Sequence, residues 1–247
     1  MNHAIVFTTN KEYLPRFYFT CKNLRTVGNY NEDIILMLGN DLSQSDIDQD
    51  FIQTNKLIIF KLPTMTFDPE TLRKIFSIPR DYYWNLKFFQ YHKFNLFHPF
   101  FKQWKYIFYI DCGINILNDI TPMLSLFKPG KIVAHSDAYP LYEWKLKRQF
   151  DSSQIEFKEL ITNYNLDIDY FQTTILLYDT SIITDRTVFD LMTLVKKYPL
   201  SITNDQGIIA LYFRNQWSQI PIKNDDTYFY DYMKRNPLDK YIMVKSL

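Results

Sequence analysis

The stretch FYIDCGINILNDI, residues 108–120, places a carboxylate directly after an apolar run. The aromatic and β-branched residues before Asp111 are typical of a buried strand, and the run stops at that residue. A charge is costly to bury, so this Asp is either exposed at a sheet edge or held there for a ligand. Gly113 lets the backbone pass close to such a ligand. An ordinary turn, in which Asp is also favoured, explains this stretch equally well.

Length and composition restrict the kind of protein. The chain has 247 residues, 47% of them hydrophobic, so it can bury a full core in one domain, and 19 Tyr and 21 Phe argue against disorder. A net charge of +1 argues against a strongly basic nucleic-acid surface, and no nucleic-acid partner is predicted. Cys21 and Cys112 are far apart and lack metal-ligand spacing, so we expect no disulfide framework and no zinc site. We expect the protein to be in a reducing compartment. Cys112 is predicted to be a small buried side chain and not a nucleophile.

The sequence shows no pattern typical of a targeting peptide, a membrane-spanning segment or a linker between domains. We find no basic leader followed by an apolar segment and no run near the roughly 20 apolar residues that span a bilayer. The chain is therefore predicted to be soluble and cytoplasmic, with virion or membrane association only through a partner. Without repeats or linkers rich in Pro, Gly or Ser, residues 1–247 are predicted to form a single domain.

Short apolar runs alternate with amphipathic segments along the chain. Strands are predicted at residues 3–9, 33–38, 56–62, 106–110, 132–136 and 170–179. Helices are predicted at residues 14–25, 68–76 with Asp68 as N-cap, 82–97, 187–198 and 205–213. Strands separated by helices predict parallel pairing in an α/β sheet that is covered on both faces. Ligands of such sheets bind beyond the carboxyl ends of the strands, and Asp111 follows one of those ends.

Two further motifs occupy similar places. TTNKEY, residues 8–13, follows the first predicted strand and precedes a helix, where nucleotides meet backbone N–H groups in many α/β folds. NDQGIIALYF, residues 204–213, puts Asp205 and Gln206 at a helix start, where both side chains could bind sugar hydroxyls. Ordinary helix capping is the alternative for each motif.

Four motifs, taken in their order along the chain, resemble those of the glycosyltransferases of family 8, the group that includes glycogenin. They are the TTN-any-any-Tyr loop, the strand ending in Asp-Cys-Gly, the YFQTT segment and the Asp-Gln pair. The resemblance extends to about residue 213 and rests on the order of the motifs. It implies the GT-A, or nucleotide-diphospho-sugar transferase, fold: an α/β Rossmann-like mixed sheet flanked by helices. It also implies a hexosyltransferase of glycan biosynthesis, which moves a sugar from a UDP-sugar donor to a hydroxyl of a glycan or glycoprotein with retention of configuration.

The resemblance implies roles for individual residues. The implied catalytic residues are Asp205 and Gln206, at the transferred sugar. The implied donor-binding residues are Thr8, Thr9, Asn10 and Tyr13 at the base and ribose, Asp111 at the ribose and metal, and Lys93, Gly113 and Gln172. Lys87 is the competing assignment for Lys93, and a solvated helix charge is the alternative for both. Gln172 lies at the family's Asn-Ser-Gly position, which reads Gln-Thr-Thr here.

The chain departs from the family at the metal. Gly113 stands where the family has its second acidic ligand, and no His follows His135 to supply the late ligand. The resemblance implies Mn²⁺ or Mg²⁺, which Asp111, the diphosphate and water could hold. As an alternative, Lys223, Lys240 or Lys245 could neutralise the phosphates.

Three other interpretations stay open at this point. An inverting enzyme would need one general base, and Asp205 or Asp137 could serve. A GT-A domain without turnover would be a nucleotide-sugar or glycan binding module. A generic α/β protein could bind another nucleotide through TTNKEY, although no P-loop or dinucleotide fingerprint is present.

Overall fold

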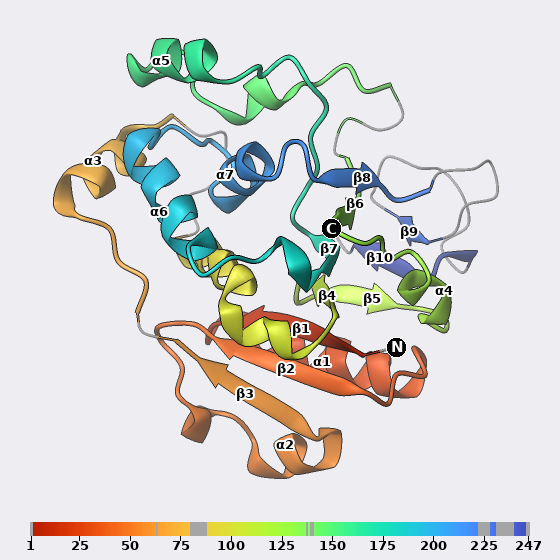
Figure 1. Cartoon of the computed structure of the whole chain (residues 1–247). Coiled ribbons are helices and arrows are strands. Elements are labelled where there is room, and N and C mark those ends of the chain that lie inside the picture. Colours follow the sequence, from red (N-terminus) through yellow and green to blue (C-terminus); the bar gives the residue numbers. More distant parts are fainter. Residues whose placement is uncertain are drawn as a thin grey trace.

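The computed structural model of the chain describes residues 2–62, 64–79, 88–136, 138, 141–221, 228–230 and 240–245. Within them, seven strands form one sheet in the order β3-β2-β1-β4-β7-β6-β8 (Figure 1). Their bounds are β1 His3–Thr9, β2 Asp33–Leu38, β3 Leu57–Lys61, β4 Tyr106–Ile110, β6 Ile132–Ala134, β7 Ile175–Asp179 and β8 Trp217–Gln219. The sequence therefore locates the first four strands to within one residue at each end.

Strand direction divides the sheet. β3, β2, β1 and β4 are parallel, as predicted, whereas β7 is antiparallel to both β4 and β6. The prediction of parallel pairing is therefore wrong for β7. A strand buried on both faces has the same apolar pattern in either direction, so the sequence does not encode which way it runs. The mixed sheet implied by the family resemblance is confirmed.

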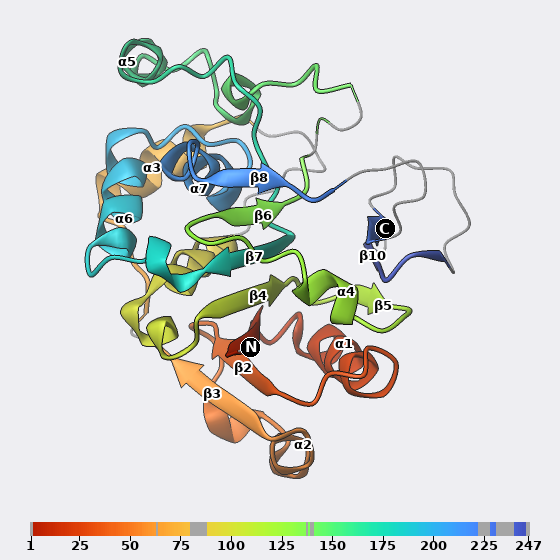
Figure 2. The ribbon, with the colours of Figure 1, turned by 45° about the vertical axis from the view of Figure 1, so that its right-hand side comes forward.

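Helices cover the sheet on both faces (Figure 2). The α-helices are α1 Leu14–Thr26, α2 Gln49–Asn55, α3 Pro69–Ser77, α4 Thr121–Leu124, α5 Glu156–Asn163, α6 Thr187–Lys197 and α7 Asp205–Tyr212. Within the described residues, the 3₁₀ helices are η1 Gln44–Asp46, η3 Phe88–Phe97, η4 Pro99–Gln103, η5 Leu146–Gln149 and η6 Thr180–Ile182. Asp68 caps α3 as predicted, because its carboxylate accepts the Thr71 N–H at 3.0 Å.

Strand β1, which lies between β2 and β4, shows how the two hydrophobic cores on the opposite faces of the sheet are built. Ala4 and Val6 point into the core on the side of η3, α6 and α7, whereas Ile5 and Phe7 point into the core on the side of α1 and α4. All four side chains are fully buried. This alternation follows from the two-residue period of a strand, and a continuous apolar run satisfies both faces at once.

Two predicted elements differ from the structure. The predicted helix at 82–97 is a 3₁₀ helix over Phe88–Phe97, and residues 82–87 lie outside the described part of the chain. The predicted strand at 170–179 begins only at Ile175, so Gln172 and the two Thr residues after it belong to the segment before β7. Their apolar and β-branched neighbours resemble strand residues because they are buried.

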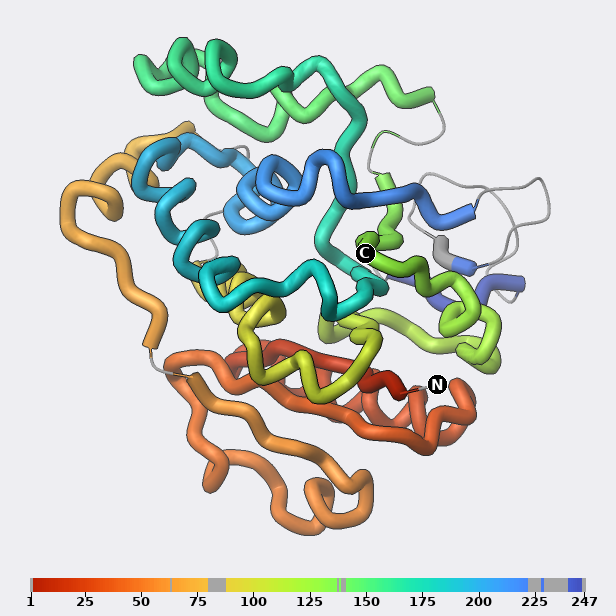
Figure 3. Tube along the Cα trace, in the orientation of Figure 1, coloured from red at the N-terminus to blue at the C-terminus, as the bar shows by residue number. Residues whose placement is uncertain are grey.

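A second, three-stranded sheet is not predicted by the sequence. It contains β5 Ile114–Ile116, β10 Met243–Lys245 and β9 Phe229–Tyr230, in the order β5-β10-β9. β10 is antiparallel to β5, with Lys245 opposite Ile114. The tube in Figure 3 shows the blue C-terminal segment returning to the yellow-green segment that follows β4. The pairing therefore brings Lys245 beside the residues that follow Asp111.

Among the described helices, we find none with the length and apolar character that crossing a membrane requires.

Candidate functional site

A pocket of about 830 Å³ lies where the carboxyl ends of β1 and β4 meet. The two strands are parallel neighbours, so the loops after Thr9 and Ile110 leave the same edge of the sheet. β7 runs the other way, so the residues before it lie at that edge too: the Asp111 N–H donates to the Thr174 carbonyl oxygen at 2.9 Å. The start of α7 completes the wall.

The structure brings most of the predicted site residues together. Those that line the pocket are Thr8, Asn10, Tyr13, Lys93, Asp111, Gly113, Asp205 and Gln206. Thr9 and Gln172 are buried outside the lining, with 0% and 1% of their surface exposed. The Gln172 amide contacts His135 Nδ1 at 3.0 Å and accepts the Thr174 hydroxyl at 2.7 Å, so it supports the segment that lines the pocket. Lys87, Asp137 and Lys223 lie outside the described residues.

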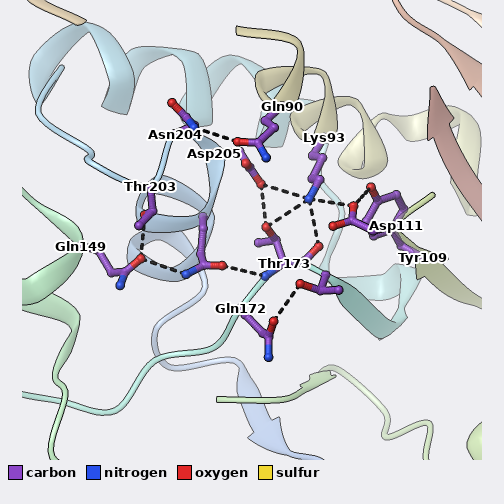
Figure 4. Close-up of polar contacts among 12 residues, drawn as sticks. Gln90, Lys93, Tyr109, Asp111, Gln149, Gln172, Thr173, Thr203, Asn204 and Asp205 are labelled. Atoms are coloured by element: carbon purple, nitrogen blue, oxygen red, sulfur yellow. Dashed lines mark hydrogen bonds and ion pairs between the residues drawn. The ribbon is translucent and has the colours of Figure 1, made fainter. Parts of the chain in front are cut away.

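Lys93 is the centre of the site (Figure 4). Its side chain is 7% exposed, and its Nζ lies 2.9 Å from Asp111 Oδ1 and 3.8 Å from Asp205 Oδ2. The ammonium also donates to the Thr173 carbonyl oxygen at 3.2 Å and lies 5.4 Å from the centre of the Tyr109 ring. It is therefore a buried cation shared by two carboxylates, and the alternative of a solvated helix charge is wrong for Lys93.

The two charged partners of Lys93 determine its protonation. Burial alone would lower the pKa of Lys93, but the attraction of Asp111 and Asp205 and the hydrogen bond to Asp111 hold the pKa above its ordinary value. The ammonium is therefore charged at neutral pH. This charge pairs Lys93 with Asp111 and with Asp205, which are both far from it in the sequence.

Asp205 is the most deeply buried carboxylate of the site, with 2% of its surface exposed. Burial raises the pKa of Asp205 to about 6, against the lowering effects of Lys93 and of the Thr173 hydroxyl, which donates to Oδ2 at 2.7 Å. Asp205 is ionised at neutral pH and takes up a proton in mild acid. Gln206 beside it accepts the Thr173 N–H at 3.3 Å and donates to Gln149 at 2.9 Å, so both side chains are held in place.

The residue before Asp205 has an unusual backbone conformation. Asn204 has a φ of 55° and a ψ of −115°, and its amide donates to Gln90 Oε1 at 2.7 Å. Non-glycine residues adopt this conformation only where the surroundings hold them in it. The bend at Asn204 starts α7 with Asp205 directed toward Lys93 and Thr173.

Asp111 has the position that the sequence predicts, immediately after β4. Its Oδ1 accepts the Tyr109 hydroxyl as well as the Lys93 ammonium. Tyr109 stays protonated, because burial raises its pKa well above the ordinary value and Asp111 adds to that effect. Cys112 donates its thiol to the Thr8 carbonyl oxygen at 3.3 Å, and desolvation followed by Asp111 raises its pKa, which disfavours the thiolate. The residue is half-buried and lines the pocket, so the prediction of a buried side chain is wrong.

The TTNKEY loop forms another wall of the pocket. The Tyr13 ring stacks on Phe89 with centroids 6.3 Å apart, and the Arg16 guanidinium lies 5.3 Å from the centre of the same ring. Asn10 Oδ1 accepts the Tyr13 N–H at 3.0 Å in the turn before α1, whereas the N-cap of α1 is Tyr13 and has no side-chain capping hydrogen bond. The buried Thr8 hydroxyl faces the pocket without a hydrogen-bond partner among the described residues.

Several pocket residues are missing from the sequence prediction. They are Glu12, Arg16, Phe19, Phe89, Gln90, Tyr109, Thr173 and Asn204. A signal for Arg16 was available, because a residue three positions after Tyr13 lies near the same face at the start of a helix. The others depend on contacts between segments that are remote in sequence. Lys245, predicted only as an alternative, also lines the pocket, whereas Lys240 does not.

The residues around Asp111 do not fit a divalent metal ion. Mn²⁺ and Mg²⁺ take oxygen ligands, typically six, and their protein sites supply carboxylates. Here Asp111 could offer only Oδ2, because its Oδ1 already binds an ammonium and a hydroxyl. In the described parts of the chain, no group of three or more His, Cys, Asp or Glu could hold a metal. The geometry around Asp111 is that of an ion pair with Lys93.

Comparison with solved structures identifies the fold. The chain matches galactosyltransferase LgtC, solved with donor and acceptor sugar analogues, with a TM-score of 0.61 at 12% identity over 98% of this chain and 86% of that one. It matches the bifunctional glycosyltransferase WbbM with a TM-score of 0.60 at 13% identity, over 92% of this chain and 39% of that one. It matches the glycosyltransferase GlyE of Streptococcus pneumoniae with a TM-score of 0.55 at 16% identity, over 89% of this chain and 45% of that one.

The fold class is therefore established: the chain has the GT-A fold of these glycosyltransferases, with a mixed sheet flanked by helices. No family model matches the sequence. A search of curated proteins gives no match either. The more specific resemblance to family 8 stays a prediction.

Proposed function

We propose that this chain is a glycosyltransferase that moves a sugar from a nucleoside-diphosphate sugar, with UDP as the nucleotide, to a hydroxyl of a glycan or glycoprotein. One observation carries the proposal. In a GT-A fold, the pocket at the carboxyl ends of β1 and β4 holds Lys93 between Asp111 and Asp205, three residues to which the family resemblance implies roles. We further propose that residues 1–247 form a single domain and that the reaction retains configuration.

The nucleotide would bind against the TTNKEY wall. The Tyr13 ring, supported by Phe89, offers a flat apolar face to a base. The Thr8 hydroxyl, which has no hydrogen-bond partner among the described residues, offers a hydrogen bond at the end of β1. Asp111 follows the neighbouring strand β4 at the same edge of the sheet, where ribose hydroxyls can donate to the carboxylate oxygen that Lys93 and Tyr109 leave free.

The transferred sugar would bind near the start of α7. The transfer breaks the bond between the anomeric carbon and the diphosphate oxygen, and it forms a bond from the acceptor oxygen to that carbon. The acceptor proton leaves with the diphosphate. Asp205 is ionised above pH 6 and lies beside this region, so its carboxylate can stabilise the positive charge that develops on the sugar. Lys93 and Thr173 hold that carboxylate in place and act as positioning residues.

Two measurements test the proposal. The first is thermal-shift screening against UDP, GDP, dTDP, ADP and their sugar conjugates, because a ligand that binds only the folded state raises the melting temperature. The second is release of free nucleotide from the sugar conjugate that binds, with glycan acceptors present. We expect a shift with one nucleotide family, and turnover that falls at least about a hundredfold in Asp205→Asn while donor binding persists.

Asp169→Asn is the matched control, because this carboxylate is exposed on the surface and pairs with Lys145 outside the pocket. It should leave binding and turnover unchanged. A protein that binds the donor and never releases nucleotide with any acceptor would contradict the transferase and indicate the binding module. The absence of any nucleotide shift would overturn the donor site itself.

A further inference from the structure

We infer that the pocket binds the diphosphate of its nucleotide without a divalent cation, and that Arg16 and Lys245 supply the positive charge in its place. The inference rests on the proposed function and deepens it, because it concerns how the same pocket holds its donor. It starts from the mismatch between Asp111 and a metal ion. Three observations carry it further: the place of Arg16, the place of Lys245, and the distribution of charge in the pocket.

Arg16 lies against the backbone where a second acidic ligand would project. Gly113 has a φ of +95°, a conformation that side chains rarely adopt. A Cβ at Gly113 would meet the Arg16 side chain, with Cδ at 3.3 Å and Nη1 at 3.9 Å. A carboxylate is therefore sterically disfavoured at this position, and a guanidinium is beside it. A divalent cation bound here would be repelled by that guanidinium.

Lys245 approaches the same region from the second sheet. Its strand pairs with β5, which places it opposite Ile114, the residue after Gly113. Its Nζ lies 3.4 Å from Thr174 Oγ1 and 3.5 Å from Gln172 Oε1, both neutral oxygens. The ammonium is thus held in the pocket wall by weak contacts that do not neutralise it.

The charges in the pocket divide into two groups. Lys93 is committed to Asp111 and Asp205. Within the described residues, Arg16 and Lys245 form no ion pair with a carboxylate, although both line the pocket. Glu12, the remaining carboxylate of the lining, is exposed and pairs with neither. The two uncommitted cations can therefore bind phosphate oxygens, Arg16 in the bidentate geometry that its guanidinium favours.

The test is isothermal titration calorimetry of the nucleoside diphosphate that gives the largest thermal shift among UDP, GDP, dTDP and ADP. Each titration is done in EDTA and again in MnCl₂. We expect wild-type dissociation constants that agree within about twofold between the two buffers. We expect Arg16→Gln and Lys245→Gln each to weaken binding by about tenfold in both buffers, and added salt to weaken wild-type binding.

The chain offers matched controls. Arg73→Gln removes an exposed arginine of α3, and Lys240→Gln removes an exposed lysine that does not line the pocket. Neither should change the affinity. Lys245→Arg keeps the charge and should restore most of the affinity that Lys245→Gln loses. Far-ultraviolet circular dichroism and the melting temperature establish that each variant is folded. Loss of the electron paramagnetic resonance signal of free Mn²⁺ measures metal binding directly. We expect no loss of this signal when only the protein and MnCl₂ are present.

The outcomes separate this inference from the proposed function. Nucleotide binding that occurs only with MnCl₂ would overturn the inference and leave the proposed function intact. Unchanged affinity in both Arg16→Gln and Lys245→Gln would also overturn it. If none of the nucleotides binds in either buffer, the proposed donor site is wrong and the inference fails with it.

Discussion

Lys93 Nζ lies 2.9 Å from Asp111 Oδ1, although one residue belongs to a 3₁₀ helix and the other follows a central strand of the sheet. The pair is held together because Lys93 is buried and has few other partners for its charge. The same ammonium reaches Asp205 at the start of α7. One cation therefore joins three segments at the pocket, and its removal should affect both stability and binding.

Lys93→Met should destabilise the protein by roughly 3 kcal/mol at pH 8, because it leaves the buried Asp205 carboxylate without its cation. The loss should be smaller at pH 5, since Asp205 then binds a proton and its charge disappears. Denaturant unfolding at the two pH values measures the difference. Lys158→Met, an exposed lysine of α5, is the control. Equal losses at pH 5 and pH 8 would contradict a role for charge.

The stability of the wild type should depend on pH through Asp205. Its pKa is about 6 in the folded state and near 3.8 when unfolded, so the folded state binds the proton first. Relative to Asp205→Asn, the wild type should therefore lose up to about 3 kcal/mol as pH rises from about 4 to above 6. The titrating group faces Lys93, Asp111 and Thr173. Unfolding free energies of both proteins across this pH range check the sign, and a difference that rises with pH would contradict it.

Tyr109→Phe should lower stability by about 1 kcal/mol and weaken nucleotide binding a few-fold, because Asp111 loses a donor that orients it. Tyr178→Phe is the matched control. Tyr178 is equally buried on the neighbouring antiparallel strand, and its hydroxyl donates to the Leu96 carbonyl oxygen outside the pocket. Both variants should lose similar stability in thermal unfolding. Only Tyr109→Phe should change nucleotide affinity in calorimetry, and equal affinities for the two would show that the hydroxyl has only a structural role.

Gly113→Ala and Gly130→Ala compare two glycines with positive φ, +95° and +63°. Each substitution should cost about 1 kcal/mol of backbone strain. A Cβ at Gly130 would meet nothing within 4 Å, whereas a Cβ at Gly113 would press on Arg16. We therefore expect only Gly113→Ala to weaken nucleotide binding. Melting temperatures and calorimetric titrations test this, and equal affinities would mean that Arg16 moves away without consequence.

The sequence by itself determined the local elements and where the candidate site residues lie along the chain. Continuous apolar runs identify β1, β2 and β4, since a strand buried on both faces needs apolar residues at nearly every position, and a similar run identifies the half-buried edge strand β3. Asp68 identifies the start of α3, because capping depends only on residues a few positions apart. Local patterns also locate Asp111, which directly follows an apolar run, and Asp205, which begins a helical segment. Their proposed roles come from the order of the motifs along the chain.

Only the tertiary structure decided how those elements meet. The direction of β7, the pairing of β10 with β5 and the burial of Lys93 depend on contacts between residues far apart in sequence. A lysine has the same local pattern whether water or two carboxylates surround its ammonium. The balance between desolvation and charge pairing at that place separates a surface charge from the centre of a site, and it exists only once the chain is folded.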